Sequence, residues 1–233
     1  APNATSFFDN LSGKEQAEWV DELLARTTFH NMNASVCLLD TGLSAEHPLL
    51  SPATREEDIQ TVESAWRIGD HDGHGSEMAG VALFNDLKGC LSDSKDVHVL
   101  HKLESVKILP PRGENPPELY GAVTEQAVAL AEIASPYTER AICMAVTSPE
   151  YGTMDGSPTS WSGAVDSITS GAEGSGRKRL FFISAGNVDP TELSAVEYPS
   201  ANILHCVENP GQSWNALTVG AYTKDITIED GAL

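Results

Sequence analysis

The chain has 233 residues, and its 34 acidic against 14 basic side chains give a formal net charge of −20. An acidic surface repels phosphate backbones and anionic lipid headgroups, which argues against nucleic acid and membrane surfaces as partners. No apolar run approaches the ~20 residues that span a bilayer, while 40% hydrophobic residues suffice for one sizeable core.

The first predicted element is a helix near the N-terminus. In residues 11–27, Ser12 and Glu15 form the capping-box pattern that opens many helices. Apolar residues then recur at helical spacing. We therefore expect residues 1–30 to be a lead-in helix and residues 31–233 to form one domain.

Six short apolar runs follow, and their lack of polar alternation is typical of strands covered on both faces of a sheet. They are residues 34–40, 105–109, 141–146, 179–185, 203–207 and 216–222. Helical patterns alternate with these runs at residues 76–87, 119–134 and 160–171. This alternation predicts a three-layer α/β/α fold with a mainly parallel central sheet.

Polar side chains stand where several of these runs end. Asp40 ends the first run, Thr147 follows the third, and Asn187 comes two residues after the fourth. Ligands bind at the carboxyl ends of strands in such sheets, so these residues are predicted to share one rim. Asp40 is expected to be at least half buried, and it then needs hydrogen-bond donors.

The stretch DHDGHGSEMAG, residues 70–80, permits a metal site. His71, His74 and Glu77 are three residues apart, a spacing that puts them on one face of a helix. However, Gly73 makes a helix through His71 unfavourable, and neither H-E-x-x-H nor H-x-x-E-H is present.

The same stretch also suits a single catalytic imidazole. His74 is predicted at the start of a helix in which the small residues Gly75, Ala79 and Gly80 allow close packing. The helix N-terminus favours the neutral imidazole, and a nearby carboxylate orients the ring. Together these effects suit a general base that works near neutral pH.

The order of these motifs resembles that of the subtilisin-like serine proteases, the subtilases. A strand ending in DTG comes first, HGSEMAG opens a helix, and a strand ending in SAGN follows. The segments LLDTGLSAEHPLL, SVKILPPRG and NALTVGAY are also similar to segments of that family. The resemblance covers the chain from about residue 33 onward and implies a subtilisin-like fold.

The resemblance implies a role for each motif. Asp40 orients the imidazole, His74 acts as general base and then general acid, and Asn187 donates to the oxyanion. Ala145, Val146 and Thr147 are expected to contact a peptide or protein substrate. The resemblance implies no cofactor, and it leaves open whether the protein binds a structural calcium ion. The HGSEMAG variant resembles intracellular bacterial subtilases accompanied by AAA ATPases, which implies such a partner.

The sequence also departs from the family pattern. Glu77 stands where a histidine is usual, and Thr147-Ser148 replaces Leu-Gly. The family's nucleophilic serine lies in a GTSMA segment after the Val-Gly-Ala strand, and no such segment occurs before Leu233. We expect a subtilisin-like domain truncated at its C-terminus and inactive as given, with Ser184 buried in its strand. A non-catalytic peptide-binding homologue and a metal-dependent hydrolase using His71, His74 and Glu77 remain alternatives.

The cysteines carry a weaker signal. Cys37, Cys90, Cys143 and Cys206 show no C-x-x-C spacing, which excludes a zinc ribbon. Cys37 and Cys143 lie in apolar runs and are expected to be buried free thiols. Free thiols favour a reducing compartment, so we expect a cytoplasmic protein.

Overall fold

A computed structural model describes residues 11–31, 33–149, 156–188, 200 and 205–221. Its main strands are β2 (Ala34–Asp40), β3 (Ile59–Thr61), β5 (Lys102–Lys107), β6 (Glu139–Met144), β7 (Leu180–Ser184) and β8 (Leu217–Val219). They form one sheet in the order β3-β5-β2-β6-β7-β8, and every pairing is parallel. A separate parallel pair joins β1 (Thr27–Phe29) to β4 (Val97–Val99). The predicted mainly parallel sheet is confirmed.

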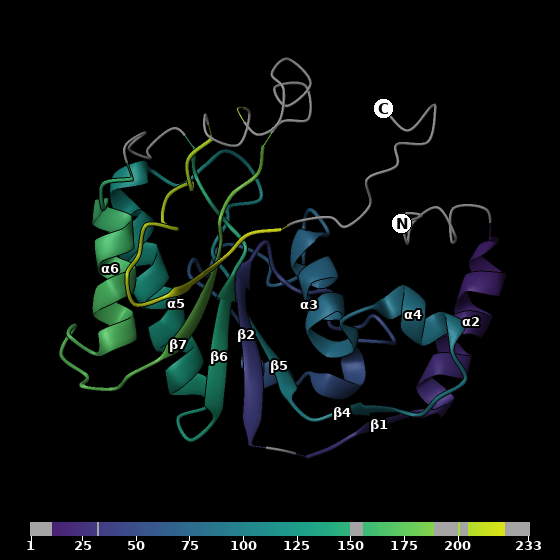
Figure 1. Ribbon diagram of the computed structural model, residues 1–233. Helices are drawn as coiled ribbons and strands as arrows, with labels where there is room; N and C mark the ends of the chain where they lie inside the picture. The colour runs from purple at the N-terminus through teal and green to yellow at the C-terminus, as the bar shows by residue number, and fades with distance from the viewer. Residues whose placement is uncertain (1–10, 32, 150–155, 189–199, 201–204, 222–233) are drawn as a thin grey trace.

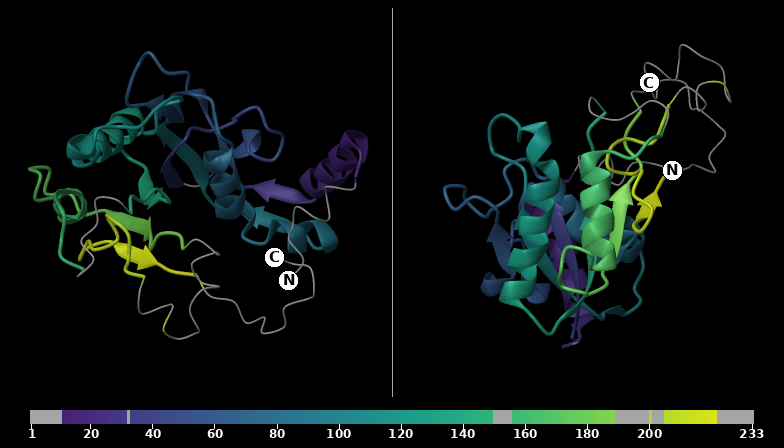
Figure 2. Two further views of the ribbon diagram at one scale, coloured as in Figure 1. Left: turned by 90° about the horizontal axis from the view of Figure 1, so that it is seen from above. Right: turned by 90° about the vertical axis from the view of Figure 1, so that its left-hand side faces the viewer.

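Helices cover both faces of this sheet. They are α2 (Gly13–Ala25), α3 (His74–Phe84), α4 (Leu87–Ser92), α5 (Tyr120–Ala134) and α6 (Ser160–Ser170). Figure 1 shows α5 and α6 against one face and α3 against the other, and Figure 2 shows the same layers from above. The predicted three-layer α/β/α arrangement is confirmed. Among the described residues, no helix is both long enough and apolar enough to cross a bilayer.

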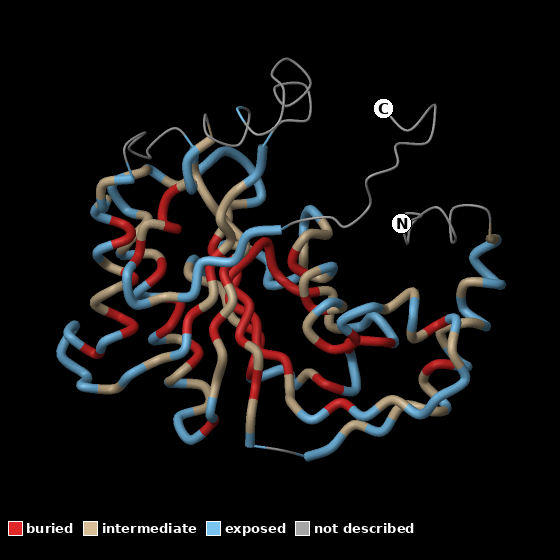
Figure 3. Tube along the Cα trace, viewed as in Figure 1, coloured by how far each residue is buried: buried red, intermediate tan, exposed pale blue. Residues whose placement is uncertain are grey.

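The two faces of the sheet carry two apolar clusters. Successive side chains of a strand point to opposite faces, so Leu38 joins the α3 side and Leu39 joins the α5 and α6 side. Leu23 of α2 is fully buried in the α3 cluster, so the lead-in helix packs against the same core. Figure 3 shows the buried residues concentrated along the central strands. The central strands are therefore packed on both faces.

Several local expectations are corrected by the structure. Residues 205–207 of the run 203–207 form no strand, and residues 203–204 lie outside the described part. The short elements β1, β3, β4 and α4 were not predicted, because three to six residues are too few to show a period. Cys37 is buried as expected, whereas Cys143 is only half-buried.

The lead-in helix follows its sequence signal closely. The Ser12 side chain accepts a hydrogen bond from the Glu15 N–H, and the Glu15 carboxylate accepts one from the Ser12 N–H, as the capping box requires. The helix ends at Ala25, and β1 then pairs with β4. The first 30 residues thus hold a strand as well as the predicted helix.

Candidate active site

Asp40 and His74 meet at the carboxyl end of the sheet. Asp40 ends β2 and is 1% exposed, and His74 is the first residue of α3. The His74 Nδ1 lies 2.8 Å from Asp40 Oδ1 and 3.0 Å from Oδ2. A neutral imidazole has one N–H, and this carboxylate holds it on Nδ1. The Nε2 of His74 is then the ring nitrogen that can accept a proton.

The residue that follows β2 also helps to orient the Asp40 carboxylate. Its Oδ1 also accepts a hydrogen bond of 2.7 Å from the Thr41 N–H. The strand that carries it lies between β5 and β6, and Asp40 is in register with Lys107. The prediction that Asp40 is at least half buried and receives hydrogen bonds is therefore confirmed.

Asp70 fastens the start of α3, although the sequence did not single it out. Its Oδ1 accepts from the Thr41 hydroxyl at 2.8 Å, the Gly73 N–H at 2.8 Å and the Asp72 N–H at 3.1 Å. Its Oδ2 accepts from the Ser76 N–H at 2.8 Å and the Ser76 hydroxyl at 2.7 Å. Burial raises the pKa of Asp70, but these hydrogen bonds outweigh it and hold that pKa well below its usual value.

The backbone of α3 approaches the β2 rim very closely at one glycine. An added Cβ at Gly75 would lie 2.1 Å from the Gly42 carbonyl oxygen, and the Gly75 N–H donates to the Thr41 hydroxyl at 3.0 Å. Ala79 is fully buried, as expected. The expectation for Gly80 is wrong, because a Cβ there would meet nothing within 4 Å.

Lys107 is a second anchor that the sequence did not reveal, since it lies inside an apolar run. Its side chain is buried, and its Nζ donates to the backbone oxygens of Arg67 at 3.0 Å and Gly69 at 2.9 Å. Burial lowers the pKa of Lys107, and the charge of Asp70 opposes that shift. The ammonium group thus ties the loop before Asp70 to the end of β5.

The charges around His74 favour its protonated form. Burial lowers the pKa of His74, but the hydrogen bond to Asp40 and the negative charges of Asp40, Glu77 and Asp72 outweigh it, so the net shift is upward. The side chain remains 42% exposed. His74 can therefore exchange protons with a group in the adjacent cleft.

His74 and Asn187 line the same cleft, which we call the His74 cleft. It has a volume of about 530 Å³ and lies along α3, β6 and β7, with Ala145, Cys143 and Ser184 also in its lining. Asn187 is exposed, and no hydrogen bond joins its side chain to another described residue. Ser184 is half-buried and accepts a hydrogen bond from the Gly186 N–H at 3.1 Å. The expectation of a buried Ser184 is therefore wrong.

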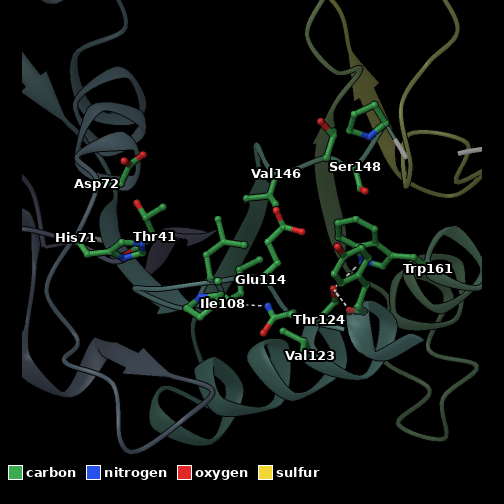
Figure 4. Close-up of a pocket in the computed structure, with 17 residues that line it drawn as sticks. Thr41, His71, Asp72, Ile108, Glu114, Val123, Thr124, Val146, Ser148 and Trp161 are labelled. Atoms are coloured by element: carbon green, nitrogen blue, oxygen red, sulfur yellow. Dashed lines mark hydrogen bonds between the residues drawn. The ribbon is translucent and has the colours of Figure 1, made fainter. Parts of the chain in front are cut away.

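Val146 and Thr147 line a different cavity, which we call the Glu114 cavity. Its volume is about 510 Å³, and it extends from Thr41 and His71 to the helices α5 and α6 (Figure 4). Residues 145–147 thus run between the two hollows, with Ala145 on the His74 cleft and the next two on the Glu114 cavity.

The end of this segment forms hydrogen bonds with another part of the chain. The Thr147 hydroxyl donates to the Glu208 carboxylate, and the Ser148 N–H donates to the backbone carbonyl oxygen of Asn209 at 2.9 Å. These bonds hold residues 147–148 against the segment that begins at residue 205.

The three residues considered for a metal do not converge. His71 Nδ1 lies 3.0 Å from the Thr41 carbonyl oxygen, while His74 Nδ1 faces Asp40. Among the residues that the structure describes, no three His, Cys, Asp or Glu side chains are placed to hold one ion. His71 and Asp72 instead belong to the loop that leads into α3.

Comparison with known proteins gives a family and a fold. The model of the subtilase family matches residues 31–230. The solved structure of Sphericase is 20% identical with a TM-score of 0.50, over 82% of this chain and 54% of that chain. The chain therefore spans about half the length of Sphericase. No curated protein sequence matches the chain.

Two further solved structures show weaker likeness. The psychrophilic subtilisin-like protease Apa1 from the Antarctic psychrotroph Pseudoalteromonas sp. AS-11 is 14% identical, with a TM-score of 0.46 over 80% of this chain and 35% of that chain. The CspB protease of Clostridium perfringens is 15% identical, with a TM-score of 0.45 over 67% of this chain and 36% of that chain.

Proposed function

The chain belongs to the subtilase family, and from that premise we propose that it carries the general base and the oxyanion donor of a serine endopeptidase. The observation that carries the proposal is the contact of His74 Nδ1 with both Asp40 oxygens, at 2.8 and 3.0 Å, beside a cleft that Asn187 also lines.

Each residue has one role in the proposed reaction. His74 Nε2 takes the proton of the attacking hydroxyl and then returns it to the leaving amine. Asp40 holds the imidazole in the tautomer with hydrogen on Nδ1 and stabilises the imidazolium that forms. Asn187 donates to the oxyanion of the tetrahedral intermediate. A substrate peptide lies along residues 145–147, at the boundary of the two hollows.

The nucleophile is proposed to come from residues beyond the 233 of this chain. The described serines near His74 are engaged or badly placed. The Ser76 hydroxyl donates to Asp70 and accepts from the Ser44 N–H, and it lies on the same turn of helix as His74. The Ser184 hydroxyl lines the same cleft and accepts from the Gly186 N–H, but no hydrogen bond among the described residues joins it to His74. By this proposal the chain alone binds peptide without hydrolysing it.

A serine-directed fluorophosphonate tests the proposal. The 233-residue chain stays unlabelled, and the protein extended through a GTSMA-like segment is labelled. His74→Ala in the extended protein abolishes labelling, whereas Ser184→Ala leaves it intact. Labelling of the short chain that Ser184→Ala removes would identify Ser184 as the nucleophile and overturn the assignment.

Labelling, peptide binding and metal content also distinguish the two alternative functions. An extended protein that binds peptide and is never labelled is a peptide-binding homologue. Stoichiometric zinc in the purified protein, lost with His71→Ala, would rule out the protease assignment of that loop and favour the metal-dependent hydrolase. An AAA ATPase partner belongs to the proposal through the resemblance of the HGSEMAG segment, and a cytoplasmic location belongs to it through the free thiols.

A further inference from the structure

We propose that the Glu114 cavity accepts a basic side chain of the bound peptide, arginine before lysine, and that Glu114 selects it. This inference rests on the proposed function, because it takes the peptide to lie along residues 145–147. Val146 and Thr147 of that segment line the cavity, so a side chain of the peptide can enter it.

The lining combines apolar surface with negative charge. Ile108, Val123 and Val146 supply aliphatic walls, and Asp72 and Glu114 supply two carboxylates. Within the described part of the chain, the lining includes neither lysine nor arginine. A volume of about 510 Å³ is ample for one long side chain.

An aromatic wall closes the side of the cavity nearest α6. The rings of Tyr120 and Trp161 lie 4.8 Å apart between centroids at 51°. The Trp161 Nε1 donates to the Thr124 hydroxyl at 2.9 Å, and that hydroxyl donates to the Tyr120 carbonyl at 2.8 Å. The wall is thus held in place before a ligand arrives. Aromatic faces attract guanidinium and ammonium groups.

The loop that carries Glu114 is held against the cavity. The Asn115 side chain donates to the Ile108 carbonyl at 2.7 Å, which folds residues 109–115 back onto the end of β5. Gly113, just before Glu114, has φ +72°, and prolines at positions 110, 111, 116 and 117 restrict the rest of the loop. Figure 4 shows the Glu114 side chain rising into the cavity toward Val146.

Glu114 has no ion-pair partner among the described residues. Among the described residues, no lysine, arginine or histidine forms an ion pair with it. Asp72 lies at the opposite rim, beside His71 (Figure 4). Glu114 is therefore the carboxylate that a side chain entering between the aliphatic and aromatic walls meets.

Arginine satisfies all parts of this lining at once. Its methylene stem covers the aliphatic walls, while its planar head stacks on aromatic rings and pairs with a carboxylate through two hydrogen bonds. An aliphatic side chain leaves the Glu114 charge unpaired, and an acidic side chain is repelled by it.

The test compares arginine with citrulline, which has nearly the same shape and no charge. Fluorescein-labelled, blocked hexapeptides of alanine carry one arginine or one citrulline at each position in turn, and anisotropy gives Kd on the 233-residue chain at 0.15 M salt. At one position the arginine peptide binds about tenfold more tightly than the citrulline peptide. Glu114→Gln reduces this ratio to less than about threefold.

Glu118→Gln is the matched control. Glu118 is an exposed glutamate four residues further along the same loop and outside the cavity lining. Glu118→Gln changes the net charge by the same amount as Glu114→Gln. Because Glu118 lies outside the cavity, the arginine preference persists in this variant. If both variants erase the preference equally, the general negative field selects the peptide, and the proposal for Glu114 is wrong.

Hydrogen exchange separates this inference from the proposed function. Peptides that protect the amides of residues 145–147 but show equal affinity for arginine and citrulline overturn the role of Glu114 and leave the proposed function standing. Peptides that bind without protecting that segment, or do not bind at all, overturn both.

Discussion

His74 and Asn187 line one cleft, yet the chain holds them very differently. The imidazole is bonded to a carboxylate that is 1% exposed, and its helix is fastened at the first turn by Asp70. Asn187 is exposed, and its side chain is bonded to no other described residue. The His74 end of the site is therefore built by contacts among the described residues, whereas no contact among them holds the Asn187 side chain.

The contrast matches the different demands that the two proposed roles make on a side chain. A general base must be held within hydrogen-bond geometry before reaction, because its tautomer decides which nitrogen takes the proton. An oxyanion donor acts only when charge develops on the substrate. Substitutions at the His74 end are accordingly expected to change both folding and activity, and those at Asn187 to change activity alone.

The largest expected effect is the difference in kcat between a His74 variant and an Asn187 variant. In the extended protein, His74→Ala lowers kcat by about 10⁶-fold, as for a member of this family. Asn187→Ala lowers it by about 10²- to 10³-fold, because the attack still proceeds without one donor. Steady-state hydrolysis of a peptide substrate measures both. Equal losses would mean that Asn187 also supports the base.

Two glycines of α3 sharpen the contrast within one helix. Gly75→Ala forces a Cβ to 2.1 Å from the Gly42 oxygen, and we expect it to lower the free energy of unfolding by about 3 kcal/mol or more, because backbone cannot give way. At Gly80 an added Cβ meets nothing within 4 Å. Gly80→Ala should raise that free energy by about 0.5–1 kcal/mol through helix propensity. Urea unfolding of the two variants gives both values.

Asp70→Ala tests whether the first turn of α3 depends on one carboxylate. Its loss leaves the Ser76 and Gly73 donors without their partner, and we expect about 2 kcal/mol of destabilisation in urea unfolding. Asp72→Ala, on the same exposed loop, should stay within about 0.5 kcal/mol. Similar losses in the two variants would assign the effect to general charge rather than to the hydrogen bonds.

The Asp70 variant also carries a pH signature. The folded pKa of Asp70 lies below its usual value, so its contribution to stability is fully present above about pH 4 and is lost as pH falls toward the folded pKa. Asp70→Ala should therefore flatten the stability–pH curve on its acid side. A curve of unchanged slope below about pH 4 would contradict the assignment.

The smallest expected effect concerns Glu77. Its charge helps to raise the pKa of His74, so Glu77→Gln lowers that pKa, and Glu77→His removes the same negative charge. NMR titration of the His74 ring in the 233-residue chain measures the shift, with Glu22→Gln on α2 as the control. In the extended protein, the acid limb of the pH–rate profile should move downward. An unmoved limb would mean that Glu77 points away from the imidazole.

The principal site residues were predictable because each stands at an element boundary with a strong local signal. Asp40 ends an apolar strand, and His74 follows a glycine at the start of a helix. Asp70 and Lys107 had no such signal, since a loop aspartate and a lysine within an apolar run do not reveal the donors and acceptors that they meet. Asp70 meets the Thr41 hydroxyl, and Lys107 meets the Arg67 and Gly69 backbone oxygens, groups that only the folded chain brings near them.

The sequence by itself determined the parallel sheet, the helical layers and the rim on which Asp40 and His74 lie, because hydrophobic period and capping residues are local. Tertiary structure alone decided that Gly75 and not Gly80 allows the close approach, that Ser184 is half-buried, and that Ala145 and Thr147 line separate hollows. These facts depend on contacts between segments far apart in the chain. No periodicity encodes such contacts, since packing between elements sets them.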